Sequence, residues 1–164
     1  MDAAATSAAV ELLGAYGVPI KPLSQAEASG VGAGLAALGV VRFTAPGLNG
    51  TAVVGAAKSV LQRSNGTKTS DRDWIAELAN QFIGRFKLKL LRGGFELWSM
   101  APVAVSGRLI LSAVSQPEFP PLAFRDSEGG ALAVWIEIEI SGQLKLETPP
   151  TDGEVPRESD VIIF

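Results

Sequence analysis

The sequence predicts a single α+β domain, a two-layer α/β arrangement in which an antiparallel sheet packs with long helices. Three observations lead to this fold class. The 164 residues suffice for one hydrophobic core without metal or disulfide support. The composition, 47% apolar and 19% charged with 18 glycines and 10 prolines, is that of a globular chain with many turns. A long helical pattern over residues 71–92 is followed by strand-like segments.

The chain contains no cysteine and no histidine. This composition excludes disulfides, thiolate nucleophiles, serine–histidine triads, imidazole acid–base chemistry and zinc sites. The net charge of −3 argues against a nucleic-acid-binding surface. No apolar run reaches the ~18 residues of a membrane span, and the N-terminus lacks the basic start of a signal peptide. We therefore expect a cytoplasmic protein that has no metal or cofactor of its own and whose partner is a protein or a small molecule.

Three elements are expected before the long helix. Residues 3–15 are rich in helix formers and stop near Gly14 and Gly17, which predicts an N-terminal helix. Residues 36–57 hold two β-type runs joined by the turn-forming segment Pro-Gly-Leu-Asn-Gly, which predicts a hairpin. A short helix over residues 57–62 is expected to end at the Asn65-Gly66 turn.

Residues 71–92 form the longest helical pattern. Ser70 can cap its start, and Asp73 follows three residues later, the spacing of a capping box. Basic residues gather in the last turns, where the helix dipole favours cations, and the Gly93-Gly94 pair ends the helix. Because the start, the body and the end agree, this helix is the firmest element of the prediction.

The chain after that helix is strand-like over residues 95–100, 103–107, 108–114 and 131–140. These runs predict a meandering antiparallel sheet with one face in water, to which Glu137 and Glu139 point. Residues 142–164 are polar and Pro-rich, which divides the chain into a domain over residues 1–141 and a flexible tail. The apolar end of the tail, Val-Ile-Ile-Phe, is read as an edge strand or a packing segment, with a docking peptide as the alternative.

Candidate functional residues lie on the long helix. At about 100° per residue, its apolar residues form a core stripe, and a narrow polar stripe lies opposite. Glu77 and Asn80 are three residues apart and are therefore neighbours on the polar stripe. Gly84 lies on the same stripe, where core packing does not explain it, and so indicates close approach by a partner. A plain solvated helix face is the alternative. Asp73, Gly84 and Lys87 are the candidate partner contacts, although capping already accounts for Asp73.

Other motifs are better explained by structure. The G-x-G-x-x-A spacing that begins at Gly32 follows no convincing strand and has no acidic residue about twenty positions later, so a dinucleotide-binding turn is not expected. The Asn-Gly-Thr triplets at Asn49 and Asn65 fit turns better than glycosylation sites. Glu137 and Glu139 alternate with isoleucines, as on an ordinary solvated strand face rather than in a carboxylate pair.

The spacing of Asp73, Glu77, Asn80, Gly84 and Pro102 resembles the signature of the CheC/CheX/FliY phosphatase family. The segments IAELANQFIGRFKLKL and MAPVAVSG are similar to the CheX branch in particular, and the motif occurs once, as in that branch. The resemblance implies a CheX/CheC-like fold and a phosphatase that removes the aspartyl phosphate of a CheY-like response regulator in chemotaxis or related two-component signalling. It also implies a homodimer, and Mg²⁺ held by the partner receiver domain.

The same resemblance places Glu77 and Asn80 at the catalytic positions. Our hypothesis is that Asn80 orients the attacking water and Glu77 pairs with a lysine of the receiver. Gly84 would admit the receiver's backbone and Lys87 would contact it. Two alternatives stay open: a noncatalytic FliM/FliY-like module that binds a receiver or a flagellar switch protein, and an unrelated α/β domain with a coincidental E-x-x-N.

Overall fold

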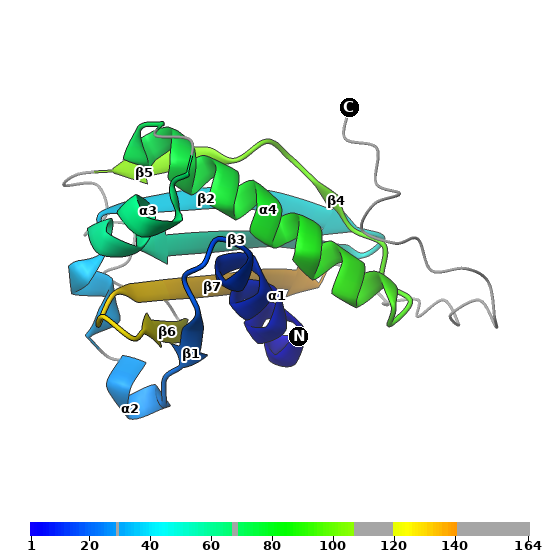
Figure 1. The fold of residues 1–164 in the computed structure, drawn as a ribbon. Coiled ribbons are helices and arrows are strands. Elements are labelled where there is room, and N and C mark those ends of the chain that lie inside the picture. Colours follow the sequence, from blue (N-terminus) through cyan, green and yellow to red (C-terminus); the bar gives the residue numbers. More distant parts are fainter. Residues whose placement is uncertain (29, 67–68, 107–119, 141–164) are drawn as a thin grey trace.

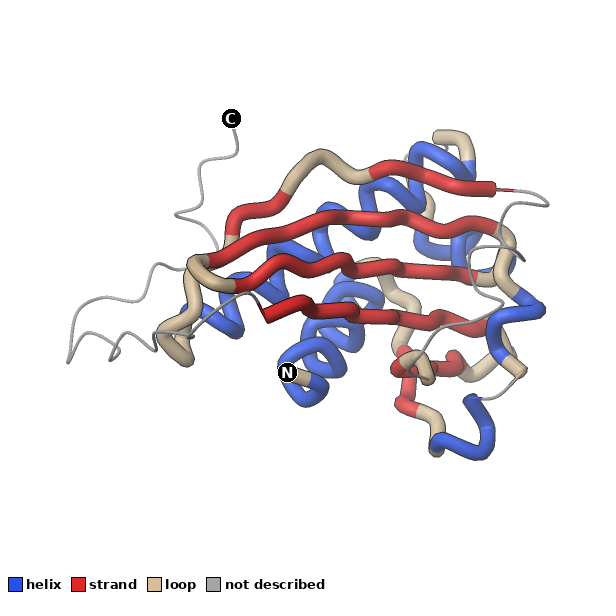
Figure 2. Tube along the Cα trace, turned by 180° about the vertical axis from the view of Figure 1, so that it is seen from behind, coloured by secondary structure: helices blue, strands red, loops and turns tan. Residues whose placement is uncertain are grey.

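The computed structural model describes residues 1–28, 30–66, 69–106 and 120–140, in which a seven-stranded antiparallel sheet carries the long helices on one face (Figure 1). The helices are α1 (Asp2–Ala15), α2 (Gln25–Ala28), the 3-10 helix η1 (Val31–Gly34), α3 (Lys58–Ser64) and α4 (Asp71–Leu91). The strands are β1 (Ile20–Pro22), β2 (Ala37–Ala45), β3 (Leu48–Ala56), β4 (Trp98–Ser99), β5 (Val103–Ser106), β6 (Leu122–Asp126) and β7 (Ala131–Ile140). Seen from behind, the sheet lies in front of α1 and α4 (Figure 2), so the predicted two-layer α+β class is confirmed.

Both predicted early helices and the hairpin are present. β2 and β3 pair without interruption from Ala37↔Ala56 to Ala45↔Leu48. Only Pro46 and Gly47 remain for the turn, and Gly47 has a φ of 73°, which glycine adopts without strain. The turn is shorter than the predicted five-residue segment because Leu48 is already in the ladder, with its side chain 1% exposed.

The main core lies between the sheet and the helices α1, α3 and α4. The rings of Phe82 and Phe86 stack with centroids 5.9 Å apart, and Phe43 of β2 meets Phe86 edge to face at 6.2 Å. α4 lies close to the sheet at Gly39, where a Cβ would come within 2.6 Å of both the Cβ of Ala79 and the carbonyl oxygen of Ile75. Aromatic packing and this close approach fix the position of α4 over β2.

The opposite face of the sheet is only partly in water, which corrects the expectation of one fully wet face. A second apolar cluster covers one end of it, and its buried members are Ala28, Val31, Leu35, Leu38, Ala123 and Ala133. The short helices α2 and η1 supply the cover, because their apolar side chains pack on strand residues of this face. Toward the other end Glu137 and Glu139 are exposed, as their alternation with isoleucine predicts.

The predicted meander is wrong. β7 lies between β3 and β6, whereas β4 and β5 lie on the far side of the β2–β3 hairpin, both paired with β2. Chain order and sheet order therefore differ: β7 pairs with β6, its neighbour in sequence, on one side, and on the other with β3 over Leu132–Ile140, so β4 and β5 are left at the opposite edge beside β2.

Several elements were not predicted. β1 is three residues long and ends in a proline, and β6 lies in a segment without clear alternation. The G-x-G-x-x-A spacing begins in η1, which follows a helix rather than a strand, and ends at Ala37, the first residue of β2. The expected strand over residues 108–114, the tail over 142–164 and its Val-Ile-Ile-Phe end lie outside the described residues. Among the helices that the structure describes, none is long and apolar enough to cross a membrane.

Candidate functional site

Local interactions at both ends define α4, the helix that carries the candidate residues. The backbone N–H of Asp73 donates to the Ser70 hydroxyl oxygen at 3.1 Å, and that hydroxyl donates to the Asp73 carboxylate at 2.6 Å. At the other end Phe95 N–H bonds to the Leu90 carbonyl, while Gly94 has a φ of 82°. These contacts provide partners for backbone N–H and C=O groups that have none within the helix. They confirm the predicted helix with its cap and its glycine stop.

The predicted division of α4 into two stripes is confirmed. The apolar residues Ile75, Leu78, Ala79, Phe82 and Phe86 are all 0% exposed. Glu77, Asn80 and Gly84 are exposed on the opposite side, and Lys87 is half-buried. Asp73 is also exposed, at the capped start of the helix.

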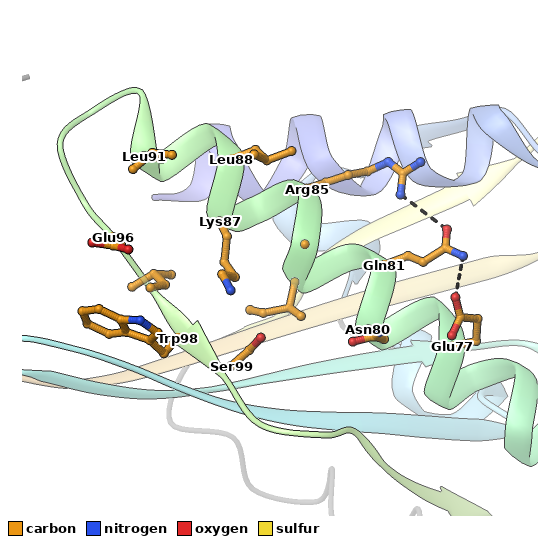
Figure 3. A pocket seen from close by; sticks show the side chains of 13 residues that line it. Glu77, Asn80, Gln81, Arg85, Lys87, Leu88, Leu91, Glu96, Trp98 and Ser99 are labelled. Carbon is orange, nitrogen blue, oxygen red and sulfur yellow. Dashed lines mark hydrogen bonds between the residues drawn. The ribbon is translucent and has the colours of Figure 1, made fainter. Parts of the chain in front are cut away.

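An open groove of about 740 Å³ runs beside the second half of α4 (Figure 3). Glu77, Asn80, Gly84 and Lys87 line it, whereas Asp73 does not. The far wall is the segment 96–99, which contains β4. The groove thus brings four of the five candidate residues together with a strand that begins more than ten residues farther along the chain.

The two ends of the groove differ in character. Around Glu77 and Asn80 the lining is polar, whereas the other end combines the apolar side chains of Leu88, Leu91 and Trp98 with the charged Lys87 and Glu96 (Figure 3). Trp98 is 50% exposed and Leu91 39% exposed. A partner seated here would meet a carboxylate and an amide at one end and mixed apolar and charged side chains at the other.

Asn80 and Gly84 are both exposed where they line the groove. Among the described residues no side-chain hydrogen bond engages the Asn80 amide, and its side chain is exposed. A Cβ placed at Gly84 would have no neighbouring heavy atom within 4 Å apart from its own helix. The protein's own packing therefore does not require glycine at this position.

Two residues that sequence reasoning missed, Gln81 and Tyr16, extend the site toward α1. The Gln81 amide nitrogen donates to a carboxylate oxygen of Glu77 at 2.7 Å, and its oxygen accepts from the Tyr16 hydroxyl at 2.8 Å. Figure 3 shows Gln81 between Glu77 and Arg85, whose guanidinium also reaches the amide oxygen at 3.4 Å. The spacing of four residues on one helix would have indicated Gln81 from Glu77. No sequence signal indicates Tyr16, which lies 65 residues away.

A second contact between α1 and α4 lies near the end of the site helix. Lys89 donates to Glu11 at 2.7 Å. This hydrogen bond is the main cause that holds the pKa of the Glu11 carboxyl below its ordinary value of 4.5. α1 is therefore tied to α4 by polar contacts at two points along α4.

The fold defined by this sheet and its site helix is that of the CheX/CheC-like chemotaxis proteins. The CheX chemotaxis protein from Vibrio vulnificus matches 82% of this chain and 95% of its own with a TM-score of 0.62 and 16% identity. A CheC-like superfamily protein from Shewanella sp. PV-4 matches 84% and 96% with a TM-score of 0.63 and 16% identity. The CheX–CheY–BeF₃–Mg²⁺ complex from Borrelia burgdorferi contains a chain that matches 82% and 92% with a TM-score of 0.56 and 17% identity. These similarities show the fold.

No family model matches the sequence. No curated protein sequence matches it either.

Proposed function

We propose that this protein dephosphorylates the aspartyl phosphate of a CheY-like response regulator in chemotaxis or a related two-component pathway. The observation that carries the proposal is the exposed Asn80 amide beside Glu77 in an open groove of a CheX/CheC-like fold. The CheX–CheY complex from Borrelia burgdorferi supports a CheY-like partner for a protein of this fold.

The reaction requires little acid–base chemistry from this chain. Water attacks the phosphorus of an acyl phosphate, the bond from phosphorus to the aspartyl oxygen breaks, and carboxylate, inorganic phosphate and a proton are released. Because the leaving group is a carboxylate, it departs without protonation. Such transfer depends mainly on positioning the attacking water and on neutralising charge. Mg²⁺, when bound in the receiver, supplies charge neutralisation on the phosphoryl oxygens.

Asn80 is the residue we assign to the attacking water. Its carboxamide can accept a hydrogen bond from the water and donate one to a phosphoryl oxygen. It is exposed at the polar end of the groove, so a docked phosphoryl group could reach it without rearrangement of α4. An amide can perform this task in a chain that has neither histidine nor cysteine.

The other candidate residues would hold the receiver. Glu77 would pair with the ammonium of a receiver lysine and so fix the docking register. Gly84 would let the receiver's backbone approach α4, since its surroundings are open. Lys87, half-buried in the groove wall, would contact the receiver directly. Asp73 lies outside the groove and would act through the cap of α4, so we assign it at most a peripheral contact.

The proposal includes a homodimer and a cytoplasmic location, since a CheY-like receiver is a cytoplasmic partner. Size-exclusion chromatography with light scattering tests the dimer. A monomeric mass across a range of protein concentrations would contradict the homodimer without affecting the proposed reaction.

The decisive experiment measures phosphate loss from candidate receivers that a small phosphodonor has phosphorylated. The wild-type protein should accelerate this loss. Asn80→Ala should lower the maximal stimulated rate by about a hundredfold or more, the scale of losing one positioning group in such a site. Asn49→Ala, an exposed asparagine on β3 outside this groove, is the matched control and should keep the wild-type rate.

Glu77→Ala should weaken binding to the phosphorylated receiver, with Glu139→Ala as its control on an exposed strand position. Full activity of Asn80→Ala would contradict the assigned mechanism. A wild-type protein that binds receivers and accelerates hydrolysis of none of them would show that the chain is a noncatalytic binding module.

A further inference from the structure

The Glu77 side chain is hydrogen-bonded to another side chain of α4. Its carboxylate oxygen Oε1 accepts a hydrogen bond from the Gln81 amide nitrogen at 2.7 Å, while the Gln81 oxygen accepts one from the Tyr16 hydroxyl at 2.8 Å. Glu77 and Gln81 are one helical turn apart, whereas Tyr16 stands at the end of α1. A short hydrogen-bonded chain therefore runs from α1 across Gln81 to the candidate docking carboxylate.

The chemistry of the partners fixes the orientation of the Gln81 amide. A carboxylate only accepts hydrogen bonds and a guanidinium only donates them. With its nitrogen on Glu77 and its oxygen facing Arg85 and Tyr16, the amide satisfies every partner. A flipped amide would set oxygen against the carboxylate and nitrogen against the guanidinium, so the observed orientation is strongly preferred.

Tyr16 is itself held in place. Its ring packs edge to face against Trp74 with centroids 5.0 Å apart and an interplanar angle of 85°. Trp74 is 4% exposed, and its indole N–H donates to the Ser64 hydroxyl at 2.8 Å. The hydroxyl that reaches Gln81 thus belongs to a ring packed against the core, which makes it a rigid anchor for a surface amide.

We propose that Gln81, anchored by Tyr16, is a positioning residue that holds the Glu77 carboxylate ready for the receiver's ammonium group. This inference rests on the proposed function. Gln81 engages one acceptor site on Oε1 of Glu77, and Oε2 together with the remaining site on Oε1 can accept from the lysine. A glutamate side chain loses rotational freedom when it is fixed in an ion pair, and a contact that fixes it beforehand reduces that loss at docking.

The competing explanation is that these hydrogen bonds only fasten α1 to α4. The two explanations differ in one respect. If Gln81 acts through Glu77, its removal weakens docking only while Glu77 is present. If it merely supports the fold, its removal has the same effect with and without Glu77.

The experiment is a double-mutant cycle with Gln81→Leu and Glu77→Ala. The dissociation constant is measured with a CheY-like receiver carrying BeF₃ and Mg²⁺, and kcat and KM for phosphate release are measured with the phosphorylated receiver. Gln81→Leu should weaken binding about three- to tenfold and raise KM similarly, because a hydrogen bond to a charged group is lost. The kcat value at saturation should stay within about twofold of wild type.

Two further variants sharpen this cycle. Tyr16→Phe keeps the ring against Trp74 and removes only the hydroxyl, so binding should weaken about two- to threefold, less than for Gln81→Leu. Gln62→Leu, the same substitution at an exposed position on α3, should bind as wild type does. In the Glu77→Ala background, Gln81→Leu should cause no additional loss. An unchanged affinity of Gln81→Leu, or an equal loss in both backgrounds, overturns the inference.

A readout without any partner separates this inference from the proposed function. The side-chain NH₂ cross peaks of Gln81 in an NMR spectrum should shift on Glu77→Ala and on Tyr16→Phe, and unchanged peaks overturn the hydrogen-bonded chain whatever the receiver does. If the wild-type protein accelerates phosphate loss and the cycle is additive, the proposed function stands and the inference fails. If no receiver loses phosphate faster while affinity still depends on Gln81 through Glu77, the phosphatase fails and the positioning role stands.

Discussion

Two glycine-to-alanine substitutions at α4 should change stability in opposite directions. Gly39 lies on β2 directly beneath α4, where a Cβ would sit 2.6 Å from the Ala79 Cβ and 2.6 Å from the Ile75 carbonyl oxygen. Nonbonded carbon atoms prefer separations of about 3.5–4.0 Å. Gly39→Ala therefore requires α4 to move away from β2 by roughly 1 Å.

The two atoms that this Cβ would meet cannot move independently of α4, because one belongs to the helix backbone and the other is a Cβ bonded to that backbone. Overpacking of this kind costs about 1–3 kcal/mol of unfolding free energy. Gly84 is the opposite case: it lies within α4 itself, and apart from the backbone of its own helix no heavy atom lies within 4 Å of an added Cβ. Gly84→Ala should stabilise the protein by about 1 kcal/mol, the difference in helix propensity between the two residues.

Urea unfolding followed by tryptophan fluorescence and circular dichroism measures both effects. At this chain length a change of 1 kcal/mol corresponds to roughly 2–4 °C in Tm, so thermal scans give an independent check. Gly84→Ala should also bind the receiver less tightly in spite of its higher stability, if Gly84 admits the partner's backbone. An unchanged midpoint for Gly39→Ala, or a lowered one for Gly84→Ala, would refute the packing argument.

Two further predictions concern polar contacts. Ser64→Ala leaves the buried indole N–H of Trp74 without its acceptor, so the unfolding free energy should fall by about 1–3 kcal/mol; a urea midpoint equal to that of wild type would contradict this. Glu11→Gln should be less stable than wild type at neutral pH, because the Lys89 hydrogen bond lowers the pKa of Glu11 in the folded state. That difference should disappear as the pH falls below 4.5 through the folded-state pKa, and a difference independent of pH in thermal scans would rule the explanation out.

The sequence alone predicted the elements that are defined by interactions between residues close together in the chain. The cap formed by Ser70 and Asp73, the helical period of the buried residues and the Gly93-Gly94 stop all act within one or two turns of α4. The hairpin of β2 and β3 is equally local, since two residues join strands that pair along their whole length. For the same reason Glu77, Asn80 and Gly84 could be placed on one exposed face before the fold was considered.

The sheet order could not be predicted in the same way. β7 pairs with β6 and with the distant β3, and its alternation does not indicate the second partner, because alternation determines which face of the sheet a side chain takes and not which strand lies beside it. β1 and β6 are short, and each is stabilised by its neighbour rather than by its own composition. The second apolar cluster could not be predicted for the same reason, because it brings α2 and η1 against strands that lie far along the chain.

The sequence by itself determined the site helix, its buried and exposed faces, and the amide and carboxylate that it presents, because helix geometry relates residues three and four positions apart. Only the tertiary structure decided what surrounds them: the wall containing β4 that makes a groove, and the Tyr16 hydroxyl that reaches Gln81 from 65 residues away. Such contacts depend on how α1 and the strands pack, and that packing is set by the apolar core as a whole rather than by any local pattern.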